Sequence, residues 1–494
     1  MEGWPFKGKT AHKLDDIILI MILMLNKLNK LLETIWFPIS FRIIALIAFI
    51  GLVIIGFTSP TDDPFFINQL AKTNLTTSFV WRLWWPLIVL SAIFIGRIWC
   101  MICPVELVTA FFARIGFKRK RPGWILSGWV ITLFYMIVLV VGITILQIDL
   151  NPKYTSLYLL FILGISIISG LIFEKNTFCR YICPVGYMLG IFSKLAPLGW
   201  RVKKESVCIK CPDKSCINDK YIYQLNYKSC GVDLIPAEIN NNNHCLLCGG
   251  CMKTCSTYKT SNNTSRPNPA IVKIGFAGDL MMLQPLRLPE WFFLFLLTGS
   301  MIFEMNHFQV ISDLGASFIS NNIINISGIN TDLVKDLAHV LYLYLVIPLI
   351  LWALPYFLLV IFMKVKISLS TYLQKVSLIF LPVIAAFFVG LVIMEITTKF
   401  PFYKYIIQDI TGVETIKSIL FRQIEMPQLP YWTEWVFILI MISALIAGIF
   451  LSFKLIGRLA YNFDIRKGRR LFYILPVIFI LIILTGALGY GFLI

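Results

Sequence analysis

Charged residues are scarce in this sequence. Asp, Glu, Lys and Arg make up 14% of the 494 residues and hydrophobic residues make up 58%, whereas roughly 25% of the residues in soluble domains are charged. A chain of this composition cannot keep so much apolar surface away from water, which excludes an ordinary soluble domain. Several uninterrupted apolar runs also reach the roughly 20 residues that a bilayer core requires. The composition therefore predicts a membrane protein.

The sequence also lacks the signatures of several enzyme classes. It has no glycine-rich nucleotide fingerprint, no nucleophile elbow and no zinc-type histidine motif. Its four histidines are His12, His244, His307 and His339. A b-type haem would need two of them at matching depth; we expect His307 and His339 to pack at the outer interface instead, and we expect no haem. His244 is expected to face solvent beside Cys245.

The formal net charge of +18 does not indicate nucleic-acid binding, because Lys and Arg lie in short loops between apolar runs. They concentrate before the first run and after the second, sixth and eighth, whereas none lies between Glu304 and Lys335. The positive-inside rule then places the N-terminus and every cysteine-bearing loop in the cytoplasm. No small-residue cleavage site follows the polar segment 1–16, so we expect no cleaved signal peptide.

The fold class predicted from these runs is an α-helical polytopic membrane protein of about nine spans with a small inserted two-cluster ferredoxin-like domain. Residues 1–35 form a cytoplasmic N-terminus with an interfacial amphipathic helix over 17–35, 36–199 a four-span domain, 200–285 the ferredoxin-like domain, and 286–494 a five-span domain. The predicted spans are 36–58, 82–99, 124–148, 156–173, 288–305, 336–361, 375–397, 434–455 and 471–493.

All twelve cysteines fall between positions 100 and 255. The last four, Cys245, Cys248, Cys251 and Cys255, follow the C-x2-C-x2-C-x3-C pattern that wraps a [4Fe-4S] cluster. The fourth cysteine of this pattern usually reaches a second cluster, and a second group is present as Cys208, Cys211, Cys216 and Cys230. We therefore expect two [4Fe-4S] clusters in a reducing compartment, and no disulfides among these cysteines.

The other four cysteines form two related pairs. Cys100 and Cys103 precede Pro104, and Cys179 and Cys183 precede Pro184. Proline disfavours helical geometry in the preceding residue but suits a helix start, which predicts helices over Val105–Phe117 and Val185–Leu195. The dipoles of these helices should lower the pKa of Cys103 and Cys183.

These two pairs have two interpretations. Each pair lies at the end of a helical hairpin. If the two hairpins pack together, the four sulfurs converge on a further metal site or a redox-active thiol site at the membrane boundary. In the alternative they remain two separate pairs of packing thiols. Arg97 and Arg180 flank the pairs and either offset thiolate charge or anchor the inner face. Glu304 and Glu395, at the outer ends of spans, mark either interfacial anchoring or a proton or quinone site.

Paired Cys-Pro motifs followed by a double-cluster segment resemble the membrane polyferredoxins, the family of NapH, the C-terminal half of NosR and the CcoG/RdxA proteins. The resemblance covers about 80–260. It implies that Cys208, Cys211, Cys216 and Cys255 hold one cluster, and Cys245, Cys248, Cys251 and Cys230 the other. This sequence departs from the simplest pattern in the longer spacings before Cys216 and Cys230, and in lacking proline after Cys230 and Cys255.

The leading functional hypothesis is a multi-pass electron-transfer protein of the bacterial inner membrane, without an identifiable substrate pocket. It would pass electrons between the clusters, the four-cysteine site, and quinone or subunits of a respiratory or periplasmic reductase. An alternative is a maturation factor that reduces copper or thiols for another enzyme. A scaffold with vestigial clusters is disfavoured because all twelve motif cysteines are present. Lipid is the expected surrounding, and nucleic acid is not an expected partner.

Overall fold

The computed structural model describes residues 36–59, 64–202, 205–223, 229–255, 276–305, 340–362, 366–425, 432–462 and 474–487, with a few single residues between them. Most of the predicted interfacial helix (17–33), His12, His307 and His339 lie outside the described residues. The described part of the chain is helical, and its one β-bridge joins Arg119 to Phe173.

The helices divide into three groups along the chain. The first group is α2 (Ile39–Thr58), α3 (Pro64–Thr73), α4 (Leu75–Thr77), η1 (Ser78–Trp84), α5 (Trp85–Phe94), α6 (Ile98–Ile102), α7 (Pro104–Ile115), α8 (Gly123–Leu126), α9 (Trp129–Ile137), η2 (Val138–Ile145), α10 (Pro152–Ile172), α11 (Thr177–Tyr181) and α12 (Pro184–Phe192). The second group consists of short helices: α13 (Glu205–Ile209), α14 (Asp219–Ile222), η3 (Pro236–Glu238) and α15 (Gly250–Thr254). The third group is η4 (Leu280–Met282), α17 (Leu288–Met305), η6 (Tyr342–Val346), α20 (Ile347–Phe357), η7 (Leu358–Phe362), α21 (Leu369–Gln374), η8 (Val376–Phe380), α22 (Leu381–Lys399), η9 (Phe400–Phe402), α23 (Tyr403–Gln408), α24 (Val413–Leu420), α25 (Trp432–Asn462) and α27 (Ile474–Ala487).

Six continuous helices in the described residues are long and apolar enough to cross a membrane. They coincide with six of the nine predicted spans and run over Ile39–Thr58, Leu75–Phe94, Pro152–Ile172, Tyr342–Ile361, Leu369–Gln408 and Trp435–Leu459. At the other three predicted positions the structure has the shorter apolar helix Trp129–Ile145, α17 and α27. These helices fit the predicted membrane class, and the count of nine stays a prediction.

The second span begins seven residues earlier than predicted. Asn74 caps the helix, because its side chain accepts from the backbone N–H groups of Thr76 and Thr77. The polar residues of this first turn are satisfied internally. The Thr76 hydroxyl, for example, donates to the Leu52 carbonyl at 2.7 Å. The span ends at Phe94, since Gly96 adopts a φ of +101° that a helix cannot continue.

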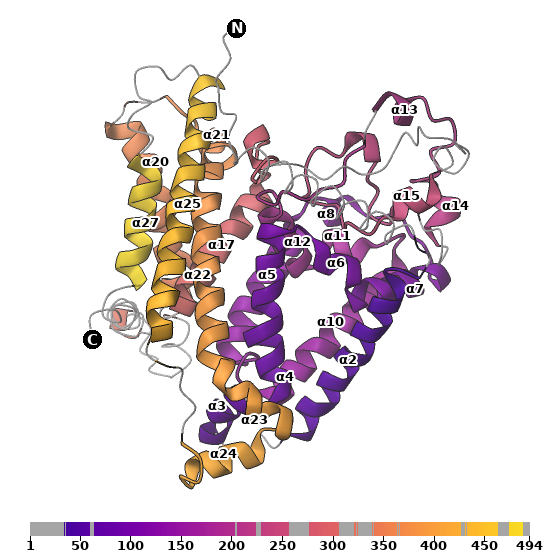
Figure 1. Cartoon of the computed structure of the whole chain (residues 1–494). Helices are drawn as coiled ribbons and strands as arrows, with labels where there is room; N and C mark the ends of the chain where they lie inside the picture. Colours follow the sequence, from indigo (N-terminus) through magenta and orange to yellow (C-terminus); the bar gives the residue numbers. More distant parts are fainter. Residues whose placement is uncertain are drawn as a thin grey trace, which may run out of the picture.

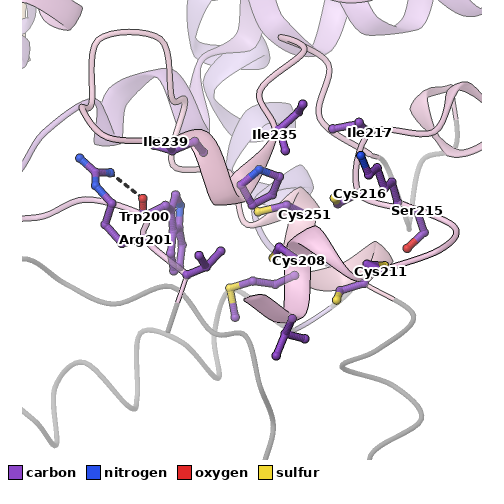
Figure 2. A pocket seen from close by; sticks show the side chains of 16 residues that line it. Trp200, Arg201, Cys208, Cys211, Ser215, Cys216, Ile217, Ile235, Ile239 and Cys251 are labelled. Carbon is purple, nitrogen blue, oxygen red and sulfur yellow. Dashed lines mark hydrogen bonds between the residues drawn. The ribbon is translucent and has the colours of Figure 1, made fainter. Parts of the chain in front are cut away.

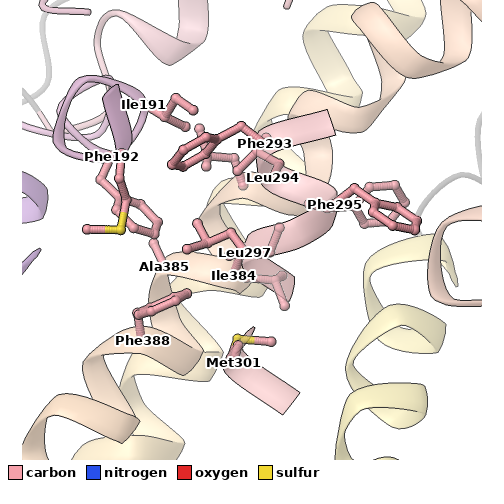
Figure 3. Close-up of a cluster of buried hydrophobic side chains, with 14 of the residues drawn as sticks. Ile191, Phe192, Phe293, Leu294, Phe295, Leu297, Met301, Ile384, Ala385 and Phe388 are labelled. Atoms are coloured by element: carbon pink, nitrogen blue, oxygen red, sulfur yellow. The ribbon is translucent and has the colours of Figure 1, made fainter. Parts of the chain in front are cut away.

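The first and third groups pack side by side as two halves of the membrane region (Figure 1). The helix α22 lies inside this arrangement, because 89% of the most apolar stretch of Leu369–Gln408 is buried within the chain. Only 11% of the corresponding stretch of Trp435–Leu459, on α25, is buried, so α25 faces outward. Aromatic contacts join the halves: Phe192 meets Phe388 at 5.3 Å between ring centroids, and Tyr135 stacks on Phe293 at 4.4 Å. Figure 3 shows this cluster, with Phe293, Leu297 and Met301 of α17 beside Ala385 and Phe388 of α22.

The two ends of the membrane region differ in content. The short helices α13, α14 and α15 lie at the same end as α6, α11 and α12, so all twelve cysteines gather there (Figure 1). The helices α3, α23 and α24 lie at the opposite end. That end is held by hydrogen bonds such as Leu75 N–H to the Ile410 carbonyl at 3.0 Å and Thr73 Oγ1 to the Gly412 carbonyl at 3.1 Å.

Candidate functional site

The two Cys-Pro motifs form the helix breaks that their sequences predict. Cys103 and Cys183 both have extended backbone conformations and stand at the N-caps of α7 and α12, with Pro104 and Pro184 as the first helical residues. The Cys183 sulfur accepts a hydrogen bond from the Gly186 N–H at 3.3 Å. These helices match the predicted ones and end two or three residues sooner.

The four cysteines of the Cys-Pro motifs line a common cavity. Cys100, Cys103, Cys179 and Cys183 line one cavity of about 290 Å³. The two pairs come from different parts of the chain, since α6 and α7 follow the second span whereas α11 and α12 follow α10. This arrangement favours one converged site over two separate pairs of packing thiols.

The pKa values of these thiols move in the direction opposite to the prediction. Burial, and then the neighbouring thiols Cys100 and Cys183, raise the pKa of Cys103 to about 12, although the backbone N–H groups of Val105 and Glu106 lower it. Burial likewise raises the pKa of Cys183 to about 11. The helix termini are present as predicted, but desolvation outweighs them. A metal bound by these thiols would compensate the thiolate charge.

Arg97 connects the four-cysteine cavity to the segment 229–255. Its guanidinium is 3% exposed, and its Nη2 lies 3.5 Å from the Cys100 sulfur while its Nη1 donates to the Asn243 carbonyl at 2.6 Å. Gly186 leaves room for it, because a Cβ there would lie 3.0 Å from the Arg97 Nη2. Arg97 therefore contacts both the four-cysteine cavity and the segment 229–255, and does not simply anchor the inner membrane face.

A buried carboxylate beside the cysteines escaped the sequence reasoning. Glu106, the second residue after Pro104, is 3% exposed, pairs with Arg42 of α2 and accepts from the Asn176 amide at 2.5 Å. Two features of the sequence could have revealed this pair: the acidic Glu106 in the first turn of α7 and the basic Arg42 inside an apolar span. Charges inside a membrane are rare unless they are paired.

Two further cavities are lined by cysteines of the segment 205–255. One, of about 50 Å³, is lined by Cys208, Cys211, Cys216, Cys251 and Cys255. In Figure 2 the labelled sulfurs of Cys208, Cys211, Cys216 and Cys251 lie around it, with Trp200 and Ile235 nearby. The other, of about 60 Å³, is lined by Cys230, Cys245, Cys248 and Cys251.

Backbone contacts bring the early and late cysteine groups together. Ser215 Oγ donates to the Thr254 carbonyl at 2.6 Å, which sets Cys216 beside Cys255, and Cys230 N–H donates to the Cys216 carbonyl at 2.7 Å. Each cavity therefore takes cysteines from the groups that the resemblance pairs, although Cys251 lines both.

The segment is bound to the membrane half by several polar contacts. The Asn176 N–H donates to the Gly231 carbonyl at 3.0 Å, and the Arg180 guanidinium donates to the Val232 carbonyl. Lys175 Nζ lies 2.6 Å from Asp233 Oδ1, and Arg121 contacts the other oxygen of Asp233. Lys175 and Asn176 lie in the loop before α11, Arg180 lies in α11 next to Cys179, and Arg121 lies just before α8.

The cavities form a continuous row. Cys251 lines both cavities of the segment 205–255, and Leu246 and Glu106 line both the second of these and the four-cysteine cavity. Adjacent cavities therefore share at least one lining side chain. No three Cys, His, Asp or Glu side chains among the described residues are grouped so that they could hold a single metal ion.

His244 does not face solvent as predicted. It is half-buried next to Cys245. Burial, together with the charges of Arg180, Arg97, Arg287 and Lys194, lowers its pKa to about 3.

A fourth cavity, of about 110 Å³, extends the row away from the cysteines. It shares Trp81, Trp85, Tyr158, Pro184 and Val185 with the four-cysteine cavity. Its charged lining residues are Arg82, Asp149, Glu304 and Glu395. Arg82 lies 3.0 Å from Glu395 and 3.9 Å from Asp149, so Glu395 is not a simple interfacial anchor.

Comparison with known families finds a 4Fe-4S binding domain in part of this chain. Residues 77–122 and 155–207 match the model of a 4Fe-4S binding domain. These two ranges contain Cys100, Cys103, Cys179 and Cys183, and end before Cys208. The match therefore falls on the two Cys-Pro hairpins, and each range covers one of them.

An uncharacterised protein of Methanocaldococcus jannaschii is 25% identical over 246 residues, which is 48% of this chain and 87% of that relative. No solved structure matches the chain. The family comparison supports a ferredoxin-type iron–sulfur protein, and the helices fit a membrane protein.

Proposed function

We propose that this protein conducts electrons along a row of iron–sulfur sites that leads from a cytoplasmic segment into the membrane. The observation that carries the proposal is the row of three cysteine-lined cavities, in which neighbouring cavities share the lining residues Cys251 and Leu246. Electron transfer requires carriers that lie close together, and the protein contributes mainly their positions and surroundings.

The residues present fit [4Fe-4S] clusters. Cys208, Cys211, Cys216 and Cys255 would hold one cluster and Cys230, Cys245, Cys248 and Cys251 a second. Each set supplies the four thiolates that such a cluster takes. Bound there, the clusters would supply one-electron carriers whose potential depends on burial and on hydrogen bonds to sulfur.

Cys100, Cys103, Cys179 and Cys183 would hold a third centre. The match of both hairpins to a 4Fe-4S binding domain supports a permanent cluster at these cysteines, and their common cavity supplies four thiols. Arg97, 3.5 Å from the Cys100 sulfur, offsets negative charge there. A permanent cluster favours electron conduction over copper or thiol reduction during the maturation of another enzyme.

The proposed setting is a cytoplasmic membrane crossed by about nine spans, with the N-terminus and the segment 200–285 on the cytoplasmic side. Electrons would pass between that segment and a membrane quinone or a respiratory or periplasmic reductase subunit. The paired Cys-Pro motifs and the double-cluster segment resemble membrane polyferredoxins, and this likeness supports these partners.

Iron and acid-labile sulfide counts on anaerobically purified protein, with EPR of the reduced state, test the proposal. We expect about eight irons from the segment 208–255 and about four more from the hairpins, at four irons per cluster. The double variant Cys103→Ser/Cys183→Ser should lose only the latter. A fully folded protein with about four irons or fewer, and no reduced-cluster signal after reconstitution, contradicts it. Exchangeable copper at the hairpins instead would indicate the maturation role.

A further inference from the structure

The four-cysteine cavity is larger than the two other cysteine-lined cavities. It measures about 290 Å³, whereas the cavities of the segment 205–255 measure about 50 and 60 Å³ and are lined by at least as many cysteines. Each of the two smaller cavities is proposed to hold one cluster on four thiols. A cluster of the same kind would therefore leave most of the four-cysteine cavity free for a second occupant. Its volume is close to the lower end of small-molecule pockets, about 300 Å³.

Apart from Arg97 and Glu106, the remaining lining is apolar, and much of it lies within membrane-crossing helices. It includes Ala45, Phe49 and Leu52 of α2, Trp81 and Trp84 of η1, and Leu159 and Ile162 of α10. A molecule that reaches this cavity through the bilayer must itself be lipid-soluble. The aromatic side chains favour a flat ring, because rings stack on one another at little conformational cost.

Two buried hydrogen-bond donors line the cavity without an acceptor. The indole Nε1 of Trp84 and the Nε of Arg97 are both withdrawn from solvent, and neither has a hydrogen-bond partner within the described part of the chain. A buried donor without a partner is costly. A ligand that carries oxygen acceptors on a ring would satisfy these groups, whereas the acyl chain of a lipid would not.

We propose that this cavity binds the ring of a lipid-soluble quinone, or of its hydroquinone, against the four cysteines. The inference deepens the proposed function and rests on it, because it identifies the membrane partner of the four-cysteine site. Trp84 and Arg97 donate to the ring oxygens, and the residues of α2 and α10 contact the ring and the start of its tail.

The adjoining cavity suits the proton balance of such a ligand. Conversion of hydroquinone to quinone breaks two O–H bonds and releases two electrons and two protons. The electrons would pass to the iron–sulfur centre proposed at the cysteines. Carboxylates of the adjoining cavity, Glu304 and Glu395, would accept the protons beyond the shared residues Trp81 and Tyr158.

Photolabelling tests the binding directly. The full-length protein, purified anaerobically in lipid nanodiscs, is illuminated with an azidonaphthoquinone, and the labelled peptides are mapped by mass spectrometry. We expect saturable labelling of residues 43–52, 79–85 or 155–162 that excess unlabelled naphthoquinone prevents. Trp84→Phe keeps the ring and removes the donor, so it should weaken binding about fivefold, the effect of one hydrogen bond. Ala45→Phe should fill the cavity and weaken binding further.

Two matched variants serve as controls. Ile47→Phe adds the same ring on the exposed face of α2, where Ile47 is 66% exposed, and Trp435→Phe removes an indole from the exposed face of α25. Neither should change the labelling. Labelling that does not saturate, or that persists in both Trp84→Phe and Ala45→Phe, overturns the quinone site. Because the iron count is measured separately, a protein with its iron but no quinone labelling contradicts only this inference, and one without iron contradicts the proposed function.

Discussion

The Arg82 guanidinium lies 3.0 Å from the Glu395 carboxylate, although 313 residues separate them in the chain. Arg82 belongs to η1 and Glu395 to α22, so the pair joins the cysteine-bearing half to the C-terminal half. Their side chains are only 11% and 21% exposed. A charge pair in this position costs desolvation energy, and removal of one partner leaves the other charge uncompensated.

Substitution of this pair should destabilise the protein unequally. Arg82→Gln leaves Glu395 and Asp149 without their shared cation, and should cost about 3 kcal/mol. Glu395→Gln leaves Arg82 next to Asp149, at 3.9 Å, and should cost less. The double variant should lose less than the sum of the single losses, because the partners interact directly. Unfolding midpoints in nanodiscs measure these changes.

The exposed pair Lys417–Glu414 provides the control, because its side chains are 50% and 74% exposed. Lys417→Gln should change stability by no more than about 0.5 kcal/mol. Equal effects of Arg82→Gln and Lys417→Gln would show that the Arg82–Glu395 contact does not hold the halves together.

Cys103→Ser and Cys183→Ser should interrupt electron transfer and spare the segment 208–255. Serine is close in size to cysteine and is a good N-cap residue, so the helices that begin at Pro104 and Pro184 should persist. We expect both variants to keep the EPR signals of the eight downstream cysteines and to lose electron exchange with the membrane partner. Stopped-flow reoxidation of anaerobic membranes measures the exchange.

Met101→Leu is the matched control for these variants. Met101 is buried next to Cys100, but it does not line the four-cysteine cavity. Its replacement should leave the reoxidation rate unchanged. Normal rates in both serine variants, with the protein stably inserted, would mean that the Cys-Pro motifs are architectural.

Asp233→Asn should loosen the segment 205–255 from the membrane half. Burial alone would raise the pKa of Asp233, but hydrogen bonds from Lys175 and Arg121 outweigh it and lower the pKa. Since the folded-state pKa lies below the unfolded value, the carboxylate stabilises the fold above the unfolded pKa, and this contribution is lost as the pH falls through the folded value. At neutral pH the Asn variant should therefore be cleaved faster in limited proteolysis between 205 and 255.

Asp219 is the control for Asp233, because it also pairs with Lys175, at 3.1 Å, but is 76% exposed. Asp219→Asn should leave the proteolysis rate nearly unchanged. If Asp219→Asn and Asp233→Asn are cleaved equally fast, the Asp233 contacts do not hold the segment.

Reporter fusions should place the cysteine-bearing end and the α24 end on opposite sides of the membrane. A reporter inserted within 256–270 should be active only in the cytoplasm, and one inserted after Arg422 only outside it. The expectation rests on the basic loops and on the separation of the two ends (Figure 1). Activity of the first fusion only outside would reverse the whole orientation, whereas activity of both on one side would refute the span count.

Local sequence determined the features that depend on neighbouring residues. The starts of α7 and α12 could be predicted because proline acts on the backbone of the residue before it. The cysteine groups could be predicted because a cluster loop needs ligands two or three residues apart. Six helices that are long and apolar enough to cross a membrane coincide with predicted apolar runs, because length and hydropathy are properties of a continuous stretch of sequence.

Only the tertiary structure decided what these pieces do together. It brought Cys100 and Cys103 to the same cavity as Cys179 and Cys183, paired Arg82 with Glu395, and left His244 half-buried. It also reversed the direction of the Cys103 pKa shift, because the helix dipole is a local effect whereas burial depends on every element packed around the thiol. Contacts between segments far apart in the chain depend on packing between helices, and spacing along a single sequence carries no record of them.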